Sequence, residues 1–283
     1  MNWSALSQAI TANTNSPFDI KSATAVSGGD IHTAYHLHTA QGEFFLKTNE
    51  RHSQRLFATE ANSLKALADT LSIRVPKVIT HGLLVHEADN CQAWLLLEYL
   101  PLTTRGDDAQ RGKDLALLHH QTHPEKRFGW FENNFIGHTL QPNEWMDDWV
   151  TFFGEQRLRH QLTLAQHHGA PARLITAGER LIANLPQFFC DYQPEASPLH
   201  GDLWGGNSAF CDDGDAVFFD PASYYGDREA DLAMTELFGG FSPAFYEGYN
   251  SIFPLDKGYA KRKDLYNLYH CLLYTSDAAD EED

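Results

Sequence analysis

Two nearby stretches decide the fold of this chain: Leu199-His200-Gly201-Asp202-Leu203-Trp204-Gly205-Gly206-Asn207 and Phe218-Phe219-Asp220-Pro221-Ala222. Asp202 and Asn207 are five positions apart, which is the spacing of the Asp-x-x-x-x-Asn catalytic loop of kinases. Phosphoryl transfer needs a carboxylate that accepts the proton of the attacking hydroxyl, and oxygen ligands that hold magnesium ions on ATP. Asp220 adds a second carboxylate thirteen positions after Asn207, so the two stretches together predict this chemistry.

The interval before Asp220 predicts a β-hairpin. The polar segment Asp212-Asp213-Gly214-Asp215 separates two short apolar runs, a typical hairpin signal. If Asp213 and Gly214 form a two-residue loop, Asn207 lies directly opposite Asp220, with Cβ atoms roughly 5 Å apart. An amide and a carboxylate in this arrangement can share a hard cation. The alternative is a surface hairpin whose polar ends are unrelated.

Upstream residues supply candidates for nucleotide binding. Gly28 and Gly29 stand between two strand-like segments, where a backbone without Cβ atoms can close over phosphates. Such a glycine pair is also common in simple turns. Lys47 ends the apolar segment 42–46 and is the candidate ligand of the α- and β-phosphates. Alternatively, Lys47 extends from a strand edge into water.

Glu60 favours the phosphate-binding interpretation of Lys47. Residues 53–71 have apolar side chains at helical spacing, namely Phe57, Ala61, Leu64, Leu67, Ala68 and Leu71. Glu60 falls within this stripe, and a carboxylate on the core face is costly unless it is paired. We therefore predict an ion pair between Glu60 and Lys47, as in kinase folds. The alternative is a glutamate at the edge of the stripe that reaches water.

At these residues the chain resembles the fructosamine kinases, or ketosamine 3-kinases, in the aminoglycoside-phosphotransferase-like branch of the protein-kinase-like fold. The resemblance is carried by residues 200–207, 220–222 and 225–234, with weaker matches at 133–137 and 149–162. It implies an α+β, two-lobed protein-kinase-like fold. The N-lobe is then small and built on an antiparallel sheet, and the C-lobe is mainly helical.

The family implies ATP-dependent phosphorylation of the sugar 3-hydroxyl of a ketosamine, such as a fructosamine, ribulosamine or erythrulosamine adduct. The 3-phosphate is unstable and leaves, so these proteins are regarded as deglycation or repair enzymes. By this resemblance Asp202 is the catalytic base, and Asn207 and Asp220 hold Mg²⁺. Lys47 then binds the phosphates of ATP, and Glu60 positions Lys47.

The same resemblance gives supporting roles to four further residues. Glu98 and Leu100 lie in 97–101, which is similar to the kinase hinge where backbone groups meet adenine. This segment also fits an ordinary buried strand that ends at a proline. His200 is expected to brace the catalytic loop, and Asp231 to support it from the following helix. Asp231 also suits a helix N-terminus, where the macrodipole favours a negative charge.

Aromatic residues around the catalytic motif are candidate substrate contacts. We expect Trp204 and Tyr225 to pack against the sugar adduct, because Trp204 is only two residues after Asp202. The alternative is that these rings fill the core of the helical lobe.

The chain divides into two expected lobes and a tail. Residues 1–100 should form the ATP-binding lobe with one helix, and residues 101–274 the helical lobe with the catalytic hairpin. Helices are predicted at 107–120, 145–168 and 174–185. From residue 275 the chain is acidic and poor in apolar residues, so we expect a disordered or non-native tail.

Composition narrows the possible partners. The chain has 21 Lys and Arg against 38 Asp and Glu, which gives a net charge of −17. This charge disfavours nucleic-acid binding and would attract an amine-bearing substrate. We see no signal peptide or membrane span, and four widely spaced cysteines fit a reducing compartment, so a cytoplasmic location is expected. His119, His120 and His123 include an i, i+4 pair, but no His-Glu-x-x-His motif and no third ligand accompany this pair, so no zinc site is expected there.

Two other functions stay open. One is a different small-molecule kinase that acts on an aminoglycoside, choline or a related alcohol. The other is a nucleotide-binding pseudokinase that serves as an interaction module. A pseudokinase usually lacks at least one of the five central residues, whereas this chain keeps Lys47, Glu60, Asp202, Asn207 and Asp220.

Overall fold

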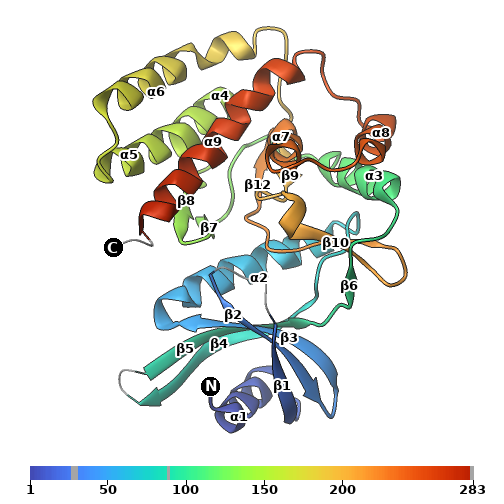
Figure 1. The fold of residues 1–283 in the computed structure, drawn as a ribbon. Coiled ribbons are helices and arrows are strands. Elements are labelled where there is room, and N and C mark those ends of the chain that lie inside the picture. The colour runs from blue at the N-terminus through green and yellow to red at the C-terminus, as the bar shows by residue number, and fades with distance from the viewer. Residues whose placement is uncertain (27–30, 88–89, 281–283) are drawn as a thin grey trace.

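A computed structural model describes residues 1–26, 31–87 and 90–280 of the chain. A part built on a β-sheet lies below a mainly helical part in Figure 1. Gly28 and Gly29, the predicted phosphate-binding glycines, lie outside the described residues.

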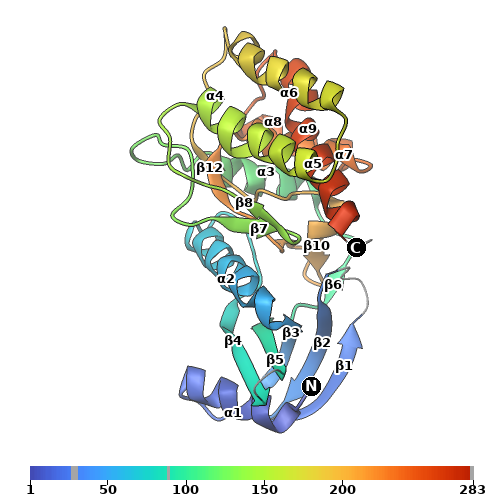
Figure 2. The same cartoon turned by 90° about the vertical axis from the view of Figure 1, so that its left-hand side faces the viewer.

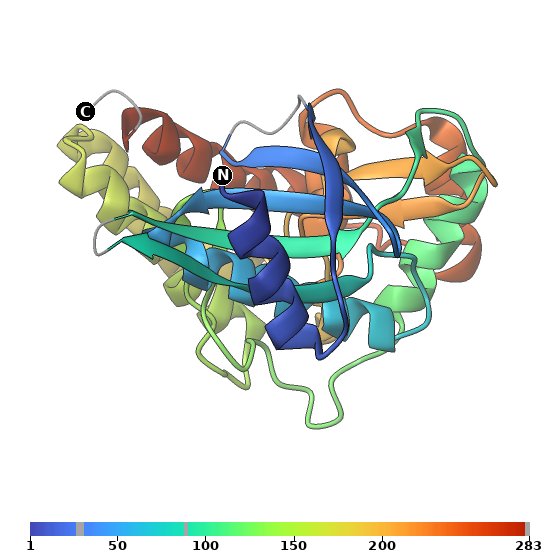
Figure 3. The same ribbon diagram turned by 90° about the horizontal axis from the view of Figure 1, so that it is seen from below.

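The N-terminal part is a five-stranded antiparallel sheet with a helix on each face. Its strand order is β1-β2-β3-β5-β4, with β1 at Ile20–Val26, β2 at Thr33–Thr39, β3 at Gly42–Glu50, β4 at Val78–Glu87 and β5 at Asn90–Glu98. Helix α1 (Trp3–Thr14) lies across one face, as Figure 3 shows from below. The short 3₁₀ turn η1 (Arg51–Ser53) leads into α2 (Gln54–Asp69), which lies between the sheet and the helical part (Figure 2).

Helix α1 is one helix more than the sequence predicted for this part. Asn2 caps it, because its side chain accepts a hydrogen bond from the backbone N–H of Ala5 at 3.1 Å. Leu6 and Ile10, one turn apart, are fully buried against the sheet in a cluster that includes Trp94. The polar residues around this narrow apolar stripe hide the helix from a sequence search for an apolar core.

The C-terminal part is mainly helical. Its helices are α3 (Asp108–His119), α4 (Trp149–Phe152), α5 (His160–His167), α6 (Ala172–Asn184), α7 (Glu229–Leu237), α8 (Pro243–Ile252) and α9 (Tyr259–Asp280). A π-helix, η2 (Phe153–Arg159), joins α4 to α5, and 3₁₀ turns form η3 (Leu185–Phe188) and η4 (Gly205–Asn207). In the described part of the chain, no helix is both long and apolar enough to cross a membrane.

Short strands complete the C-terminal part. They pair as β7 (Asn134–Ile136) with β8 (Thr139–Gln141), β9 (Ser197–Leu199) with β12 (Tyr224–Gly226), and β6 (Leu102–Thr103), β10 (Ser208–Cys211) and β11 (Ala216–Phe218) in the order β11-β10-β6.

Two helix boundaries differ from the sequence predictions by more than two residues. The helix expected from residue 145 begins at Trp149, because the side chain of Asp148 accepts the backbone N–H of Thr151 at 2.7 Å and caps it there. Met146 instead pairs with Phe128 in an isolated bridge. Helix α9 continues to Asp280, which differs from the disorder expected from residue 275.

Segments of both parts form hydrogen bonds with the catalytic hairpin, and side chains of both parts form one apolar core around it. Strand β6 follows β5 closely and pairs with β10, with Thr103 opposite Phe210. On the other side of the hairpin, the backbone N–H of Phe218 donates to the carbonyl of Arg74 at 2.9 Å. One apolar cluster contains residues of both parts, among them Phe57, Leu64, Leu97, Leu115, Leu203, Phe210 and Phe218. The hairpin is therefore fixed by both parts of the molecule.

Candidate active site

Lys47 lies at the centre of a cluster of three charged side chains. Its Nζ donates to Glu60 Oε1 at 2.8 Å and to Asp220 Oδ1 at 2.5 Å. Strand β3 supplies the lysine, helix α2 supplies Glu60, and the segment after β11 supplies Asp220. The ion pair predicted from the apolar stripe of α2 is thus present. The second contact, from Lys47 to Asp220, connects the sheet to the segment that follows the catalytic hairpin.

Burial and charge act against each other in this cluster. Burial lowers the pKa of Lys47, but the negative charges of Asp220 and Glu60 outweigh burial and hold that pKa above its ordinary value. The lysine is therefore a fixed cation at neutral pH. Burial raises the pKa of Glu60, and the nearby ammonium opposes this rise. Removing Lys47 would leave the largely buried carboxylate of Glu60 without a compensating charge.

Asp202 and Asn207 form the second cluster of the site. Asn207 Nδ2 donates to the backbone carbonyl of Asp202 at 2.9 Å and to its Oδ2 at 3.0 Å. Burial, followed by the negative charge of Asp220, raises the pKa of Asp202 to about 7. A carboxylate with a pKa near the working pH is well suited to accept and release a proton.

The hairpin register differs from the predicted one. Ser208 pairs with Phe218, and Cys211 closes the ladder with Asp215, so the loop has three residues instead of two. Gly214 takes a φ of +88°, the left-handed conformation that such a loop requires. Asn207 therefore lies opposite Phe219, whose N–H donates to the Asn207 carbonyl at 3.0 Å.

Asp220 follows one position beyond the predicted pairing and has an unusual backbone. Its φ of 57° lies in the left-handed region, which few residues other than glycine adopt. This turn brings the Asp220 carboxylate to Lys47, where its side chain is 45% exposed. The Asp220 carboxylate is thus accessible to solvent. The prediction that Asp220 lies directly across the hairpin from Asn207 is wrong.

Asp231, at the start of α7, holds the beginning of the catalytic loop. Its carboxylate accepts the backbone N–H of His200 at 2.7 Å and of Gly201 at 2.9 Å. His119 Nε2 is 3.1 Å from the same carboxylate. Burial raises the pKa of Asp231, but the hydrogen bonds from His119 and from the backbone N–H of Gly201 outweigh it and lower that pKa. Gly201 has a φ of +86°, and a Cβ there would meet the Ala222 carbonyl at 2.1 Å.

His200 links the loop to the residue before Asp220. Its Nε2 is 2.9 Å from the carbonyl oxygen of Phe219, so Nε2 carries the proton and donates. Its Nδ1 accepts the backbone N–H of Asp202 at 3.3 Å. Burial lowers the pKa of His200, which fits a neutral ring with this tautomer. These contacts fit the predicted bracing role.

His119 and Tyr249 support Asp231, and the sequence did not indicate this. Tyr249 OH lies 2.9 Å from His119 Nδ1, and Arg228 Nη1 donates to the same hydroxyl at 3.1 Å. Burial lowers the pKa of His119, so a neutral ring donates through Nε2 to Asp231 and accepts at Nδ1 from Tyr249. The contacts of His119 with Tyr249 and Asp231 span more than 100 positions of sequence. The available signal was therefore limited to the presence of three polar residues on otherwise apolar helix faces.

The segment predicted as the hinge connects the two parts. Strand β5 ends at Glu98. The backbone N–H of Glu98 donates to the Lys77 carbonyl at 2.8 Å, and the backbone N–H of Lys77 donates to Glu98 Oε2 at 3.1 Å. Leu100 is buried with Cys211 and Val217 of the catalytic hairpin. Leu100 therefore packs on the hairpin, whereas Glu98 pairs with Lys77, and the adenine contacts of both residues stay a prediction.

The two predicted substrate aromatics lie in different surroundings. Trp204 is 36% exposed, and its ring meets that of Phe238 edge-on at 6.0 Å. Tyr225 instead packs among His123, Trp130 and Trp145. Trp204 is thus partly exposed on the catalytic loop, whereas Tyr225 packs in a separate group of aromatic side chains.

The donor set fits a hard cation. The Asn207 amide nitrogen is engaged with Asp202, which leaves its carbonyl oxygen as the atom of that amide able to bind a metal. The Asp220 carboxylate is accessible and already balances one positive charge, that of Lys47. Carboxylate and amide oxygens are the donors that Mg²⁺ accepts.

Comparisons with known proteins identify the family. The sequence model of the fructosamine kinase family matches residues 2–278. The chain belongs to the fructosamine kinase family. This family member is 43% identical over 276 residues to the probable ketoamine kinase slr1563 of Synechocystis sp., a match that covers 95% of this chain and 89% of that protein. It is 39% identical over 249 residues to the chloroplastic protein-ribulosamine 3-kinase of Arabidopsis thaliana, a match that covers 88% of this chain and 75% of that protein.

Solved structures agree with this assignment. The crystal structure of a protein assigned as fructosamine-3-kinase from Haemophilus somnus 129PT is similar with a TM-score of 0.86 and 30% identity, over 99% of this chain and 92% of that one. The choline kinase LicA of Streptococcus pneumoniae shares the fold alone, with a TM-score of 0.63 and 13% identity. The predicted two-lobed kinase fold of this family member is thereby confirmed.

Proposed function

We propose that this fructosamine kinase family member transfers the γ-phosphoryl group of ATP to the sugar 3-hydroxyl of a ketosamine. The observation that carries the proposal is the convergence of two clusters, Lys47–Glu60–Asp220 and Asp202–Asn207, within one family match. Relatives named as ketoamine and ribulosamine kinases support the substrate class.

The residues act in defined roles. Asp202 accepts the proton of the attacking hydroxyl as the new oxygen–phosphorus bond forms and the bond to the ADP oxygen breaks. Lys47, held as a cation by its two carboxylate partners, offsets the charge of the ATP phosphates. Asn207 and Asp220 would hold Mg²⁺, which screens the phosphate charge when bound. Asp231 and His200 keep the loop that carries Asp202 in place.

The remaining expectations are part of the same proposal. Residues 1–100 and 101–274 form the two lobes, with adenine at the Glu98–Leu100 segment. Trp204 contacts the sugar or amine part of the substrate because its ring is partly exposed on the catalytic loop. The net charge of −17 favours a cationic amine over a nucleic acid as the binding partner. The enzyme is proposed to act on ketosamines in the cytoplasm.

A phosphorylation screen tests this function. The chain would be incubated with Mg²⁺–ATP and the synthetic ketosamines fructosyl-lysine, ribulosyl-lysine and erythrulosyl-lysine. Kanamycin and choline would be tested in parallel. We expect turnover of at least one ketosamine, with the phosphate assigned to the 3-position by NMR. Faster turnover of kanamycin or choline, or phosphorylation at another hydroxyl, would contradict the proposal.

A further inference from the structure

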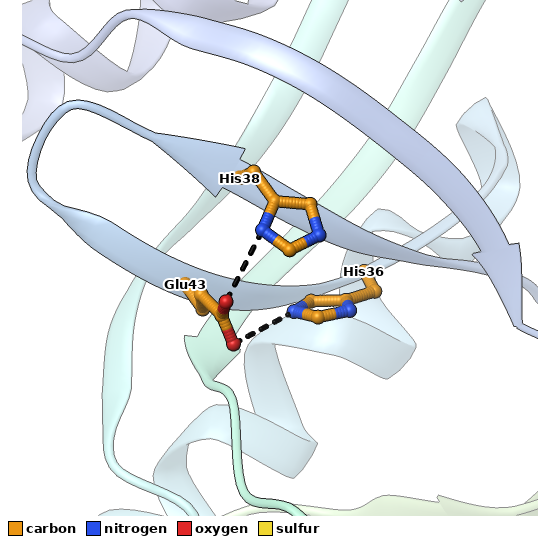
Figure 4. Close-up of side chains that lie close together, drawn as sticks. All are labelled: His36, His38 and Glu43. Carbon is orange, nitrogen blue, oxygen red and sulfur yellow. Dashed lines mark hydrogen bonds and ion pairs between the residues drawn. The ribbon is translucent and has the colours of Figure 1, made fainter.

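The β2–β3 hairpin carries a cluster of two histidines and one glutamate that phosphoryl transfer does not use. His36 and His38 alternate along β2, so both side chains project from the same face of the sheet. Glu43, on β3, is paired directly with His38. Figure 4 shows the three side chains pointing toward one another. One potential ligand atom from each residue, a ring nitrogen or a carboxylate oxygen, lies within 4.8 Å of the other two.

The spacing of these atoms is close to that of a metal site. Glu43 Oε2 lies 3.2 Å from His36 Nε2, and Glu43 Oε1 lies 3.2 Å from His38 Nδ1. In a tetrahedral zinc site with bonds of about 2.0–2.1 Å, ligand atoms are roughly 3.3–3.4 Å apart. Small side-chain rotations would therefore let all three residues coordinate one ion.

We propose that His36, His38 and Glu43 bind a divalent transition-metal ion of the Zn²⁺ type. Two imidazole nitrogens and one carboxylate suit such ions, whereas Mg²⁺ and Ca²⁺ prefer oxygen donors throughout. The side chains of His38 and Glu43 are 45% and 50% exposed, so an ion can enter from solvent. Three protein ligands leave a fourth position for water or another donor.

The site lies beside the region assigned to the nucleotide. Glu43 and Lys47 are four residues apart on β3, so the alternation of the strand places both on the same face. His36 also stacks on Tyr99, with ring centroids 3.6 Å apart and planes within 8°. Tyr99 stands in the segment Glu98–Leu100 that joins the two parts. An ion on His36 would hold a ring that borders this connection.

Calorimetric titration with Zn²⁺ tests the site. The full chain would be saturated with Mg²⁺–ADP, so that Zn²⁺ does not compete at Asn207 and Asp220. The site variants are His38→Ala and Glu43→Gln. His167→Ala is the matched control, because His167 is an exposed histidine on α5. We expect one tight Zn²⁺ per wild-type chain, unchanged in the control and weakened at least tenfold in both site variants.

Thermal unfolding supplies a second readout that does not depend on kinase activity. An ion that binds the folded chain raises its unfolding temperature. Zn²⁺ should therefore raise it in the wild type and the control but not in the site variants, and EDTA should reverse the rise. The same rise in all four proteins, or unchanged tight binding in both site variants, would overturn the proposal and move the ion elsewhere, for example to the exposed thiol of Cys190.

Discussion

Two aspartates of the catalytic region, Asp231 and Asp202, have opposite electrostatic environments. Asp231 is buried and accepts two backbone N–H groups and the ring of His119, and its pKa lies below the ordinary value. Asp202 accepts side-chain hydrogen bonds from Asn207 at 3.0 Å and from the Tyr274 hydroxyl at 3.4 Å, but burial and the charge of Asp220 outweigh them and raise its pKa to about 7. Backbone donors on one side and a neighbouring carboxylate on the other, rather than burial alone, separate an aspartate that anchors a loop from one that can exchange a proton.

Replacing Asp202 by Asn gives the largest expected effect. Asn keeps the size of the side chain and a donor–acceptor pair for Asn207, but it cannot accept the proton of the attacking hydroxyl. We expect kcat to fall ~10³-fold, within the range for a lost general base, whereas ADP affinity changes less than about twofold. Steady-state kinetics and calorimetry of ADP binding would show this split. Near-normal turnover would refute the assignment of the base.

Replacing Asp231 by Asn tests the anchoring half of the comparison. An amide cannot satisfy two backbone donors and His119 as the carboxylate does, so the loop start and the buried network are both weakened. We expect a loss of ~3 kcal/mol in the free energy of unfolding and a fall in kcat of ~10–100-fold. Denaturant unfolding and kinetics measure the two effects. Asp264→Asn, exposed on α9, is the control, and an equal result in both variants would argue against the anchor.

The sequence predicted those parts of the site that depend on a local pattern. Glu60 stood out because a carboxylate interrupts an apolar helix stripe, and its contact with Lys47 is present. The Asp202–Asn207 contact also follows from spacing within one loop. The hairpin register was wrong because Asp213-Gly214 suits both two- and three-residue loops, and only the left-handed Gly214 within the folded sheet decides between them.

Long-range features were beyond sequence reasoning. The support of Asp231 by His119 joins α3 to α7 across 112 positions, and no periodicity within either helix encodes it. The stacking of His36 on Tyr99 likewise joins β2 to a residue just after β5, although β3 separates these two strands in the sheet. Helix α1 was missed because its polar residues outnumber its buried pair, Leu6 and Ile10. Tertiary packing, rather than local preference, fixes these features.

Replacing Trp204 by Ala separates binding from chemistry on the loop that carries Asp202. Its ring is partly exposed and packs on Phe238, so its removal should cost substrate contact without moving the carboxylate. We expect KM for a ketosamine to rise ~3–10-fold, as for the loss of one aromatic contact of about 0.5–1.5 kcal/mol, with kcat changed less than twofold. Phe131→Ala, another exposed aromatic, should leave KM unchanged. A fall in kcat alone would instead give Trp204 a structural role.

The smallest effect concerns stability, and it has opposite signs for the two aspartates. The pKa of Asp202 in the folded chain, about 7, exceeds the ordinary value near 3.8, so between these pH values the folded state binds the extra proton. Wild-type stability contributed by this group is therefore present at pH 4 and lost as the pH rises through 7. Asp202→Asn has no such loss, so its unfolding temperature should match the wild type at pH 4 and exceed it by ~2 °C at pH 8.

The lowered pKa of Asp231 gives the reverse dependence. Its carboxylate stabilises the fold above the ordinary aspartate pKa, and this contribution disappears as the pH falls through the lower folded value. The deficit of Asp231→Asn should therefore be largest at neutral pH and shrink toward pH 3. Unfolding temperatures of both variants and the wild type between pH 3 and 8 measure this. Difference curves with the same sign would mean that the two carboxylates do not differ in the way their hydrogen bonds indicate, and both sets of roles would then have to be reassigned.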